Sequence, residues 1–291
     1  MNVAVSMWSL VSYAQAGRID TLGFVRYAAE LGVQGVELLD VFWQDQEREL
    51  SQVRTELQRV GIEVSAYAIG NDLVEPDTAE RGRQVQSIRD GVDVARELGT
   101  SRLRVFSGNE KPDVQTEDGH RWIIDGLGEG AAYAAERGVT LVLENHGLFA
   151  GRADQVRRVI EEVGSPALRA NLDTGNFLLV NQDPVAAVRE LAPWAAYVHL
   201  KDFRKVRDGE QVQESYAGRD GSRYVGTVIG AGEVDLRGVL GALRETGYDG
   251  WLSIEYEGTG DAKEELAESV NATRLLVYQL STRSHYHAGW P

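Results

Sequence analysis

A repeat marked by glycine constrains the fold of this chain more than any other feature. Six times an amphipathic stretch is followed by a glycine and then, within a few residues, by a short apolar run. The glycines are Gly32, Gly61, Gly99, Gly138, Gly164 and Gly247. A glycine at the end of a helix supplies the left-handed residue that closes the last turn. Strands that begin soon afterwards are typical of α/β units. The repeat therefore predicts alternating helices and strands.

The apolar runs have the length and composition of buried strands. With one run at the N-terminus and one before a long polar segment there are eight of them: Val3–Met7, Val36–Leu39, Ile62–Ala66, Leu103–Phe106, Val139–Leu143, Leu168–Leu172, Ala195–Leu200 and Trp251–Ile254. Most recur every ~30 to 40 residues, the length of one βα unit. Eight such units favour a closed (β/α)8 barrel, called a TIM barrel, over an open parallel sheet. The Gly-x-Gly-x-x-Gly motif of dinucleotide-binding proteins does not follow the first run, which weakens that alternative.

No shift in composition divides the chain, so we expect a single barrel domain over residues 1–280 and a C-terminal extension over 281–291. One interval breaks the repeat, because the polar, glycine-rich segment 202–233 predicts a long loop after the seventh strand. This loop is slightly basic. It could recognise an anionic substrate group, contact another subunit, or simply be solvated.

Composition excludes several classes of protein. The net charge of −15 argues against broad binding to nucleic acid or to an anionic membrane surface. The chain has no cysteine, so thiolate metal sites and cysteine nucleophiles are excluded. It shows neither a secretory signal nor an apolar run long enough to span a membrane. We expect a cytoplasmic protein that acts on a small molecule, and homo-oligomerisation stays open.

Four polar side chains stand at the C-terminal ends of four successive predicted strands. They are Glu144, Asp173, His199 and Glu255. Polar side chains at the end of a buried strand are costly unless something pairs with them. The active site of a TIM barrel lies at this end of the strands, and the ends of neighbouring strands can converge there. Three carboxylates and one imidazole predict a site for one divalent cation, with Mn²⁺ as the first expectation and Mg²⁺, Co²⁺ or Zn²⁺ as alternatives.

The segments around these residues resemble the xylose isomerase-like barrel superfamily of sugar phosphate isomerases and epimerases. The matching segments are Leu143–His146, Leu172–Asn176, His199–Asp202, Ser253–Glu255 and Gly35–Leu39. The resemblance implies that Glu144, Asp173, His199 and Glu255 bind the cation and that the two glutamates also transfer protons. It implies a metal-dependent isomerase or epimerase that works through an enediolate on a carbohydrate substrate.

The resemblance also has departures. The second glutamate that ketose epimerases carry after the fifth strand is missing, and Asn176 stands where they have a histidine. His146 follows Glu144 by two residues and points to the same side if the strand continues, so we expect it to be a catalytic base. Candidate substrate-binding residues are Asn176, Glu37 and the two lysines after the seventh strand, Lys201 and Lys205.

Two further functions stay open. A base separate from the metal ligands suits elimination, so a keto-sugar dehydratase or lyase, similar to inosose dehydratases or 3-keto-glycoside lyases, is the alternative. An AP endonuclease-type enzyme would need more histidine and aspartate ligands than this acidic chain offers.

Overall fold

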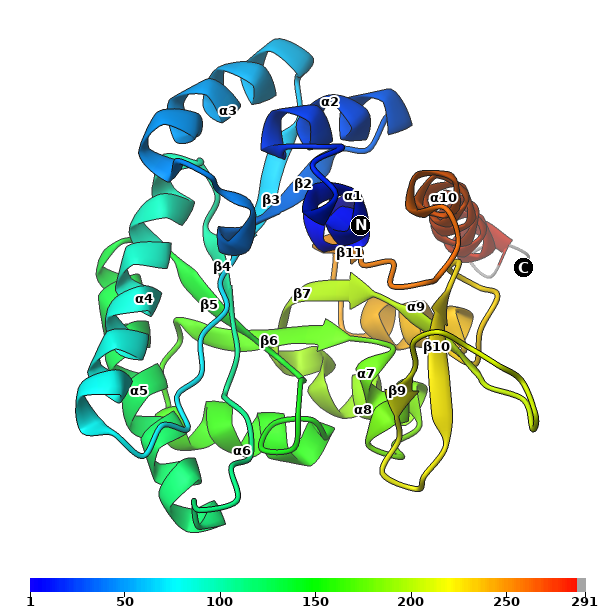
Figure 1. Ribbon diagram of the computed structural model, residues 1–291. Helices are drawn as coiled ribbons and strands as arrows, with labels where there is room; N and C mark the ends of the chain where they lie inside the picture. The colour runs from blue at the N-terminus through cyan, green and yellow to red at the C-terminus, as the bar shows by residue number, and fades with distance from the viewer. Residues whose placement is uncertain (287–291) are drawn as a thin grey trace.

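The computed structural model describes residues 1–286, with side chains described as far as Thr282. Eight parallel strands close into a barrel in the order β1-β11-β7-β6-β5-β4-β3-β2, and the helices surround it (Figure 1). The predicted (β/α)8 barrel is thereby confirmed. The barrel strands are β1 (Asn2–Ser6), β2 (Gly35–Leu39), β3 (Glu63–Ala68), β4 (Arg102–Val105), β5 (Thr140–Glu144), β6 (Leu168–Asp173), β7 (Ala195–Leu200) and β11 (Trp251–Ile254).

Helices connect the strands as the repeat predicts. The α-helices are α1 (Val11–Gln15), α2 (Thr21–Leu31), α3 (Gln46–Val60), α4 (Thr78–Glu97), α5 (Thr116–Glu136), α6 (Ala153–Val163), α7 (Asn176–Leu179), α8 (Pro184–Leu191), α9 (Leu236–Glu245) and α10 (Ala262–Tyr286). Short 3-10 helices are η1 (Met7–Leu10), η2 (Asp40–Phe42) and η3 (Ala192–Trp194). No helix within residues 1–286 is long and apolar enough to cross a membrane.

The ends of the helices explain why the repeat is visible in the sequence. All six glycines of the repeat have a positive φ, between 64° and 81°. Such values are accessible to glycine without the clash that a Cβ atom causes. Several helices begin with an aspartate whose carboxylate accepts a backbone N–H; these aspartates are Asp20, Asp45, Asp77, Asp183 and Asp235. The side chain thereby satisfies a donor that the helix leaves free.

Two parts of the chain depart from the pattern of one strand and one helix. Segment 202–233 contains a small antiparallel sheet of order β8-β10-β9, made of β8 (Asp202–Lys205), β9 (Tyr216–Ala217) and β10 (Arg223–Thr227). Helix α10 continues through Tyr286, so the first residues of the expected extension 281–291 are helical, and 287–291 lie outside the described residues.

The barrel interior changes character along its axis. A buried apolar cluster formed by Ala4, Ala66, Val142, Tyr197 and Trp251 is separate from the main core between strands and helices. Side chains alternate along a strand, so the interior positions two residues further along carry Ala68 on β3 and the polar residues Ser6, Glu144, His199 and Ser253 on the other four strands. The C-terminal end of the interior is therefore polar.

Candidate metal centre and active site

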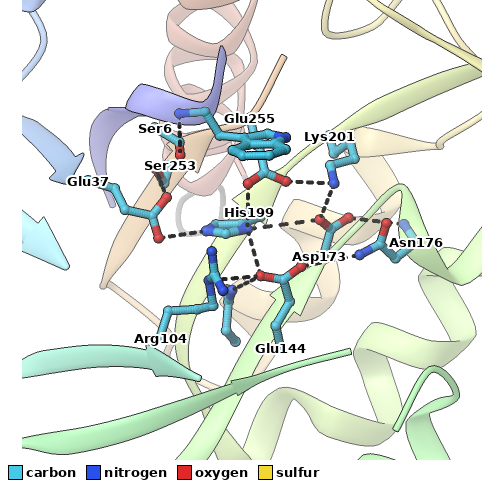
Figure 2. A network of polar contacts seen from close by, with 12 residues as sticks. Ser6, Glu37, Arg104, Glu144, Asp173, Asn176, His199, Lys201, Ser253 and Glu255 are labelled. Atoms are coloured by element: carbon cyan, nitrogen blue, oxygen red, sulfur yellow. Dashed lines mark hydrogen bonds and ion pairs between the residues drawn. The ribbon is translucent and has the colours of Figure 1, made fainter. Parts of the chain in front are cut away.

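Glu144, Asp173, His199 and Glu255 meet at the C-terminal end of the barrel. All four are buried, and one ligand atom from each lies within 4.8 Å of the others. Strand register produces this convergence, because Asp173 of β6 pairs with His199 of β7. Figure 2 shows the three carboxylates around the imidazole. Oxygens of Glu144, Glu255 and Asp173 lie 3.4, 3.6 and 3.9 Å from His199 Nδ1.

The imidazole of His199 is fixed from behind by Glu37 of β2. Nε2 of His199 lies 2.9 Å from Glu37 Oε1, and both side chains are fully buried (Figure 2). Nδ1 on the other side of the ring has no hydrogen-bond partner. Burial opposes protonation of His199, but the Glu37 and Glu255 carboxylates outweigh it and raise the pKa of the imidazole to about 10. A buried, unpartnered nitrogen that faces three carboxylates suits a divalent cation, with Glu37 orienting the ring.

Two buried cations share the site with the carboxylates. Lys201 Nζ lies 2.6 Å from Glu255 Oε2, 2.9 Å from Asp173 Oδ2 and 3.4 Å from Glu257 Oε1. On the opposite side, Arg104 Nε lies 3.3 Å from Glu144 Oε2. Both cations therefore compensate part of the charge that the carboxylates concentrate here.

The carboxyl groups differ in their affinity for protons. Burial would raise the pKa of Glu255, but Lys201 and His199 reverse this and lower it to about 2. For Asp173, burial dominates over the attraction of Lys201 and raises the pKa to about 6. Burial likewise raises the pKa of Glu144, with Arg104 opposing. Glu255 is therefore the weakest base of these three groups.

Hydrogen bonds from neighbouring segments orient the carboxylates. The backbone N–H groups of Gly175 and Asn176 both donate to Asp173 Oδ1 at 3.0 Å. The Asn176 amide donates to Glu144 Oε1 at 3.4 Å and to the Asn145 carbonyl at 3.1 Å. The start of α7 thus links two predicted metal ligands.

A pocket of about 240 Å³ opens directly above this cluster. Its wall includes Glu144, Glu255, Arg104, Lys201 and Asn176. The other lining residues are Trp8, Leu39, Asp40, Val41, Gly70, Phe106, His146, Leu179, Tyr216 and Glu257. The pocket is small compared with the roughly 300–1,000 Å³ of sites for drug-sized ligands. Its size suits a ligand of one ring.

His146 reaches this pocket although the strand does not extend to it. Strand β5 ends at Glu144, and His146 lies in the following turn, in an isolated bridge with Ala150. Its ring packs against Phe106 with a centroid distance of 4.8 Å. Displacement of water by the surrounding protein and the nearby cation Lys201 lower the pKa of the imidazole.

Comparison with known proteins assigns the family. The sequence pattern of the xylose isomerase-like TIM barrel family matches residues 25–276. The chain belongs to this family. The inosose dehydratase of Geobacillus kaustophilus (strain HTA426) is 27% identical over 247 residues, which cover 79% of this chain and 77% of that protein. Several other inosose dehydratases match over 48–60% of their own length.

Solved structures agree on the barrel. An L-ribulose 3-epimerase superposes with a TM-score of 0.76 at 17% identity and covers 99% of this chain and 98% of its own. A probable 3-DHS dehydratase from Bacillus anthracis gives a TM-score of 0.72 at 20% identity, with 94% and 99% covered. At these identities the likeness shows the fold alone. The proteins similar to this chain thus bear the names of epimerases and of dehydratases. These comparisons support an enzyme, but they do not confirm the expected isomerase or epimerase, and the inosose dehydratase relatives are nearer to the dehydratase alternative.

The structure does not bring every predicted residue of this family member to the pocket. Lys205 is exposed and lines a separate surface hollow next to the β8-β10-β9 sheet. Glu37 lies behind His199 and outside the pocket wall, so its contacts are those of a positioning residue. Asn176 and Lys201 both line the pocket.

Sequence reasoning missed Arg104, Glu257, Trp8 and Tyr216. The sequence could have indicated Arg104, because an arginine at an interior position of a buried strand needs a buried partner of opposite charge. Glu257 stands two residues after Glu255, and this spacing could have indicated it. Trp8 and Tyr216 belong to η1 and β9, whose positions at the pocket depend on tertiary packing.

Proposed function

We propose that this protein is a divalent-metal-dependent dehydratase that removes water from a small polyhydroxylated cyclic ketone of the inosose type. The observation that carries the proposal is His146, a base on the pocket wall that is not one of the four predicted metal ligands. The similarity to the Geobacillus kaustophilus inosose dehydratase supports it.

The donor set fits the expected cation. Glu144, Asp173, His199 and Glu255 would hold it, with Nδ1 of the histidine as the only nitrogen. When bound, a divalent cation acts as a Lewis acid toward the ketone and the neighbouring hydroxyl and makes the adjacent C–H more acidic.

His146 removes the proton from the carbon next to the ketone. Its lowered pKa keeps the imidazole neutral at pH 7, so it can accept a proton there. The electron pair of the C–H bond forms a double bond, and the C–O bond at the next carbon breaks. The departing oxygen takes this proton from the His146 imidazolium and leaves as water. His146 is thereby restored to its neutral form. Lys201 lines the same pocket but keeps its own proton, because its carboxylate partners Asp173, Glu255 and Glu257 outweigh the effect of burial and raise its pKa well above the ordinary value.

Epimerisation is the second candidate, because Glu144 and Glu255 both line the pocket and could act as two bases. The environments of these two glutamates favour His146 as the base instead. The pKa of Glu255 is lowered to about 2, which makes it a weak base. Glu144 is engaged by Arg104 and by the Asn176 amide.

The test is incubation of the Mn²⁺-loaded protein with an inosose in D₂O, followed by mass spectrometry. We expect a product lighter by one water. His146→Gln should slow its formation by about 10²–10⁴-fold without loss of metal. His120→Gln is the matched control, because His120 pairs with Glu162 on the surface. If the protein instead forms an epimer that contains solvent deuterium and has lost no water, the result would favour an epimerase. If His146→Gln eliminates water at the same rate as the unmodified protein, His146 is not the base.

A further inference from the structure

Glu257 is a carboxylate in the pocket wall that is neither a predicted ligand nor part of the proposed proton transfers. Its Oε1 accepts a hydrogen bond from Trp8 Nε1 at 2.7 Å and lies 3.4 Å from Lys201 Nζ. The Tyr216 hydroxyl also lies near enough to this carboxylate to interact with it. Both aromatic residues line the pocket.

The position of Glu257 is fixed by the small sheet after β7. Gly226 of β10 forms a bridge with Gly258. A Cβ atom at Gly226 would lie 2.3 Å from the backbone of Glu257, so the two segments touch main chain to main chain. Tyr216 of β9 packs on Phe203 of β8 with a centroid distance of 5.0 Å. This packing holds the carboxylate at the wall.

The pocket wall has no cationic side chain left over for an anionic ligand. Arg104 and Lys201 are the cationic residues that line it, and each is paired with carboxylates of the site. Asp40 and Glu257 line the pocket in addition to the carboxylates of the metal centre. With a divalent cation and a neutral His199, five carboxylates against two cationic side chains leave one net negative charge.

We infer that Glu257 is a specificity-determining residue that selects uncharged polyhydroxylated ketones and excludes carboxylated or phosphorylated analogues. A carboxylate accepts hydrogen bonds from hydroxyl groups, whereas an anionic substituent in its place meets a like charge. The inference rests on the proposed function for the reaction at this site, but ligand selection is measurable without turnover.

The test compares two ring ketones, an uncharged inosose and 3-DHS, which carries a carboxylate. Dissociation constants are measured by calorimetry at pH 8 on metal-loaded protein in the His146→Gln background, where turnover does not interfere. We expect the inosose to bind at least about 100-fold more tightly than 3-DHS. Glu257→Gln should narrow this ratio about tenfold or more, by weakening inosose binding and strengthening 3-DHS binding.

Two further variants complete the design. Tyr216→Phe removes the hydroxyl that contacts Glu257 and should shift the ratio in the same direction by less, which also covers a failure of Glu257→Gln to fold. Glu233→Gln removes an exposed carboxylate from segment 202–233, which also contains Tyr216, and should leave the ratio of the two dissociation constants unchanged. Equal binding of both ketones, binding of neither, or an unchanged ratio in Glu257→Gln would overturn the inference. Absence of water loss with an intact ratio would refute only the proposed function.

Discussion

Replacement of Glu37 by glutamine tests whether the proposed metal centre depends on a residue that is not one of its four predicted ligands. Glu37 lies 2.9 Å from His199 Nε2, and both side chains are fully buried. Glutamine keeps the shape and one acceptor but removes the charge. A hydrogen bond with a charged group contributes about 1.5–3 kcal/mol, against about 0.5–1.5 kcal/mol for a neutral one. The difference of about 1–1.5 kcal/mol corresponds to roughly a tenfold change in affinity.

Loss of the carboxylate also removes its long-range attraction for the cation. We therefore expect Glu37→Gln to weaken Mn²⁺ binding by about 10–100-fold. The measurement is competition with a chelator of known affinity at several pH values between 7 and 9. The affinities are corrected for the proton that His199 releases, because Glu37 also raises the pKa of this imidazole. Circular dichroism establishes that the variant is folded. Glu63→Gln is the control, because it removes an exposed carboxylate at the start of β3. A Mn²⁺ affinity within about twofold of the unmodified protein would refute the reasoning.

Two further predictions follow from the buried charges. Metal binding through Nδ1 must displace the proton that the raised pKa of about 10 places on His199, so Mn²⁺ affinity should rise by about tenfold per pH unit between pH 7 and 9. Calorimetry in buffers of different ionisation enthalpy should detect about one released proton. A Mn²⁺ affinity that does not change with pH would contradict this protonation state. Asp202 accepts the backbone N–H groups of Gly232 and Val234 at 2.9 and 3.1 Å, so Asp202→Ala should lower the free energy of unfolding by about 3 kcal/mol in urea titrations. Asp208→Ala, at an exposed position of the same segment 202–233, should change the free energy of unfolding by less than about 0.5 kcal/mol. An equal loss of stability in the two variants would show that the loop is not anchored through Asp202.

The sequence indicates the barrel because its signals are local. A glycine after a helix precedes six of the eight short apolar strands, and the structure confirms the closed barrel. The convergence of Glu144, Asp173, His199 and Glu255 follows from the shared end of parallel strands, and the structure places them within reach of one cation.

The remainder of the pocket depends on long-range packing. Trp8 and Glu257 meet across 249 positions of sequence, and Tyr216 arrives on a two-residue strand that no periodic pattern indicates. Glu37 has the side-chain type of a substrate-binding residue, but its place behind His199 depends on how β2 and β7 face each other across the barrel. Tertiary geometry of this kind is not encoded in the spacing of residues.

The pairing of β1 with β11 has a consequence for how the protein is made. The first and the last strand close the barrel, and the Ser9 hydroxyl donates to the carbonyl of Ile254 and accepts from the N–H of Tyr256. During synthesis, the N-terminal strand must therefore wait for the last strand to leave the ribosome before its partner exists. The proposed metal centre therefore stays incomplete until Glu255 is made, and a product terminated between His199 and Glu255 would carry three of the four predicted ligands and an open seam.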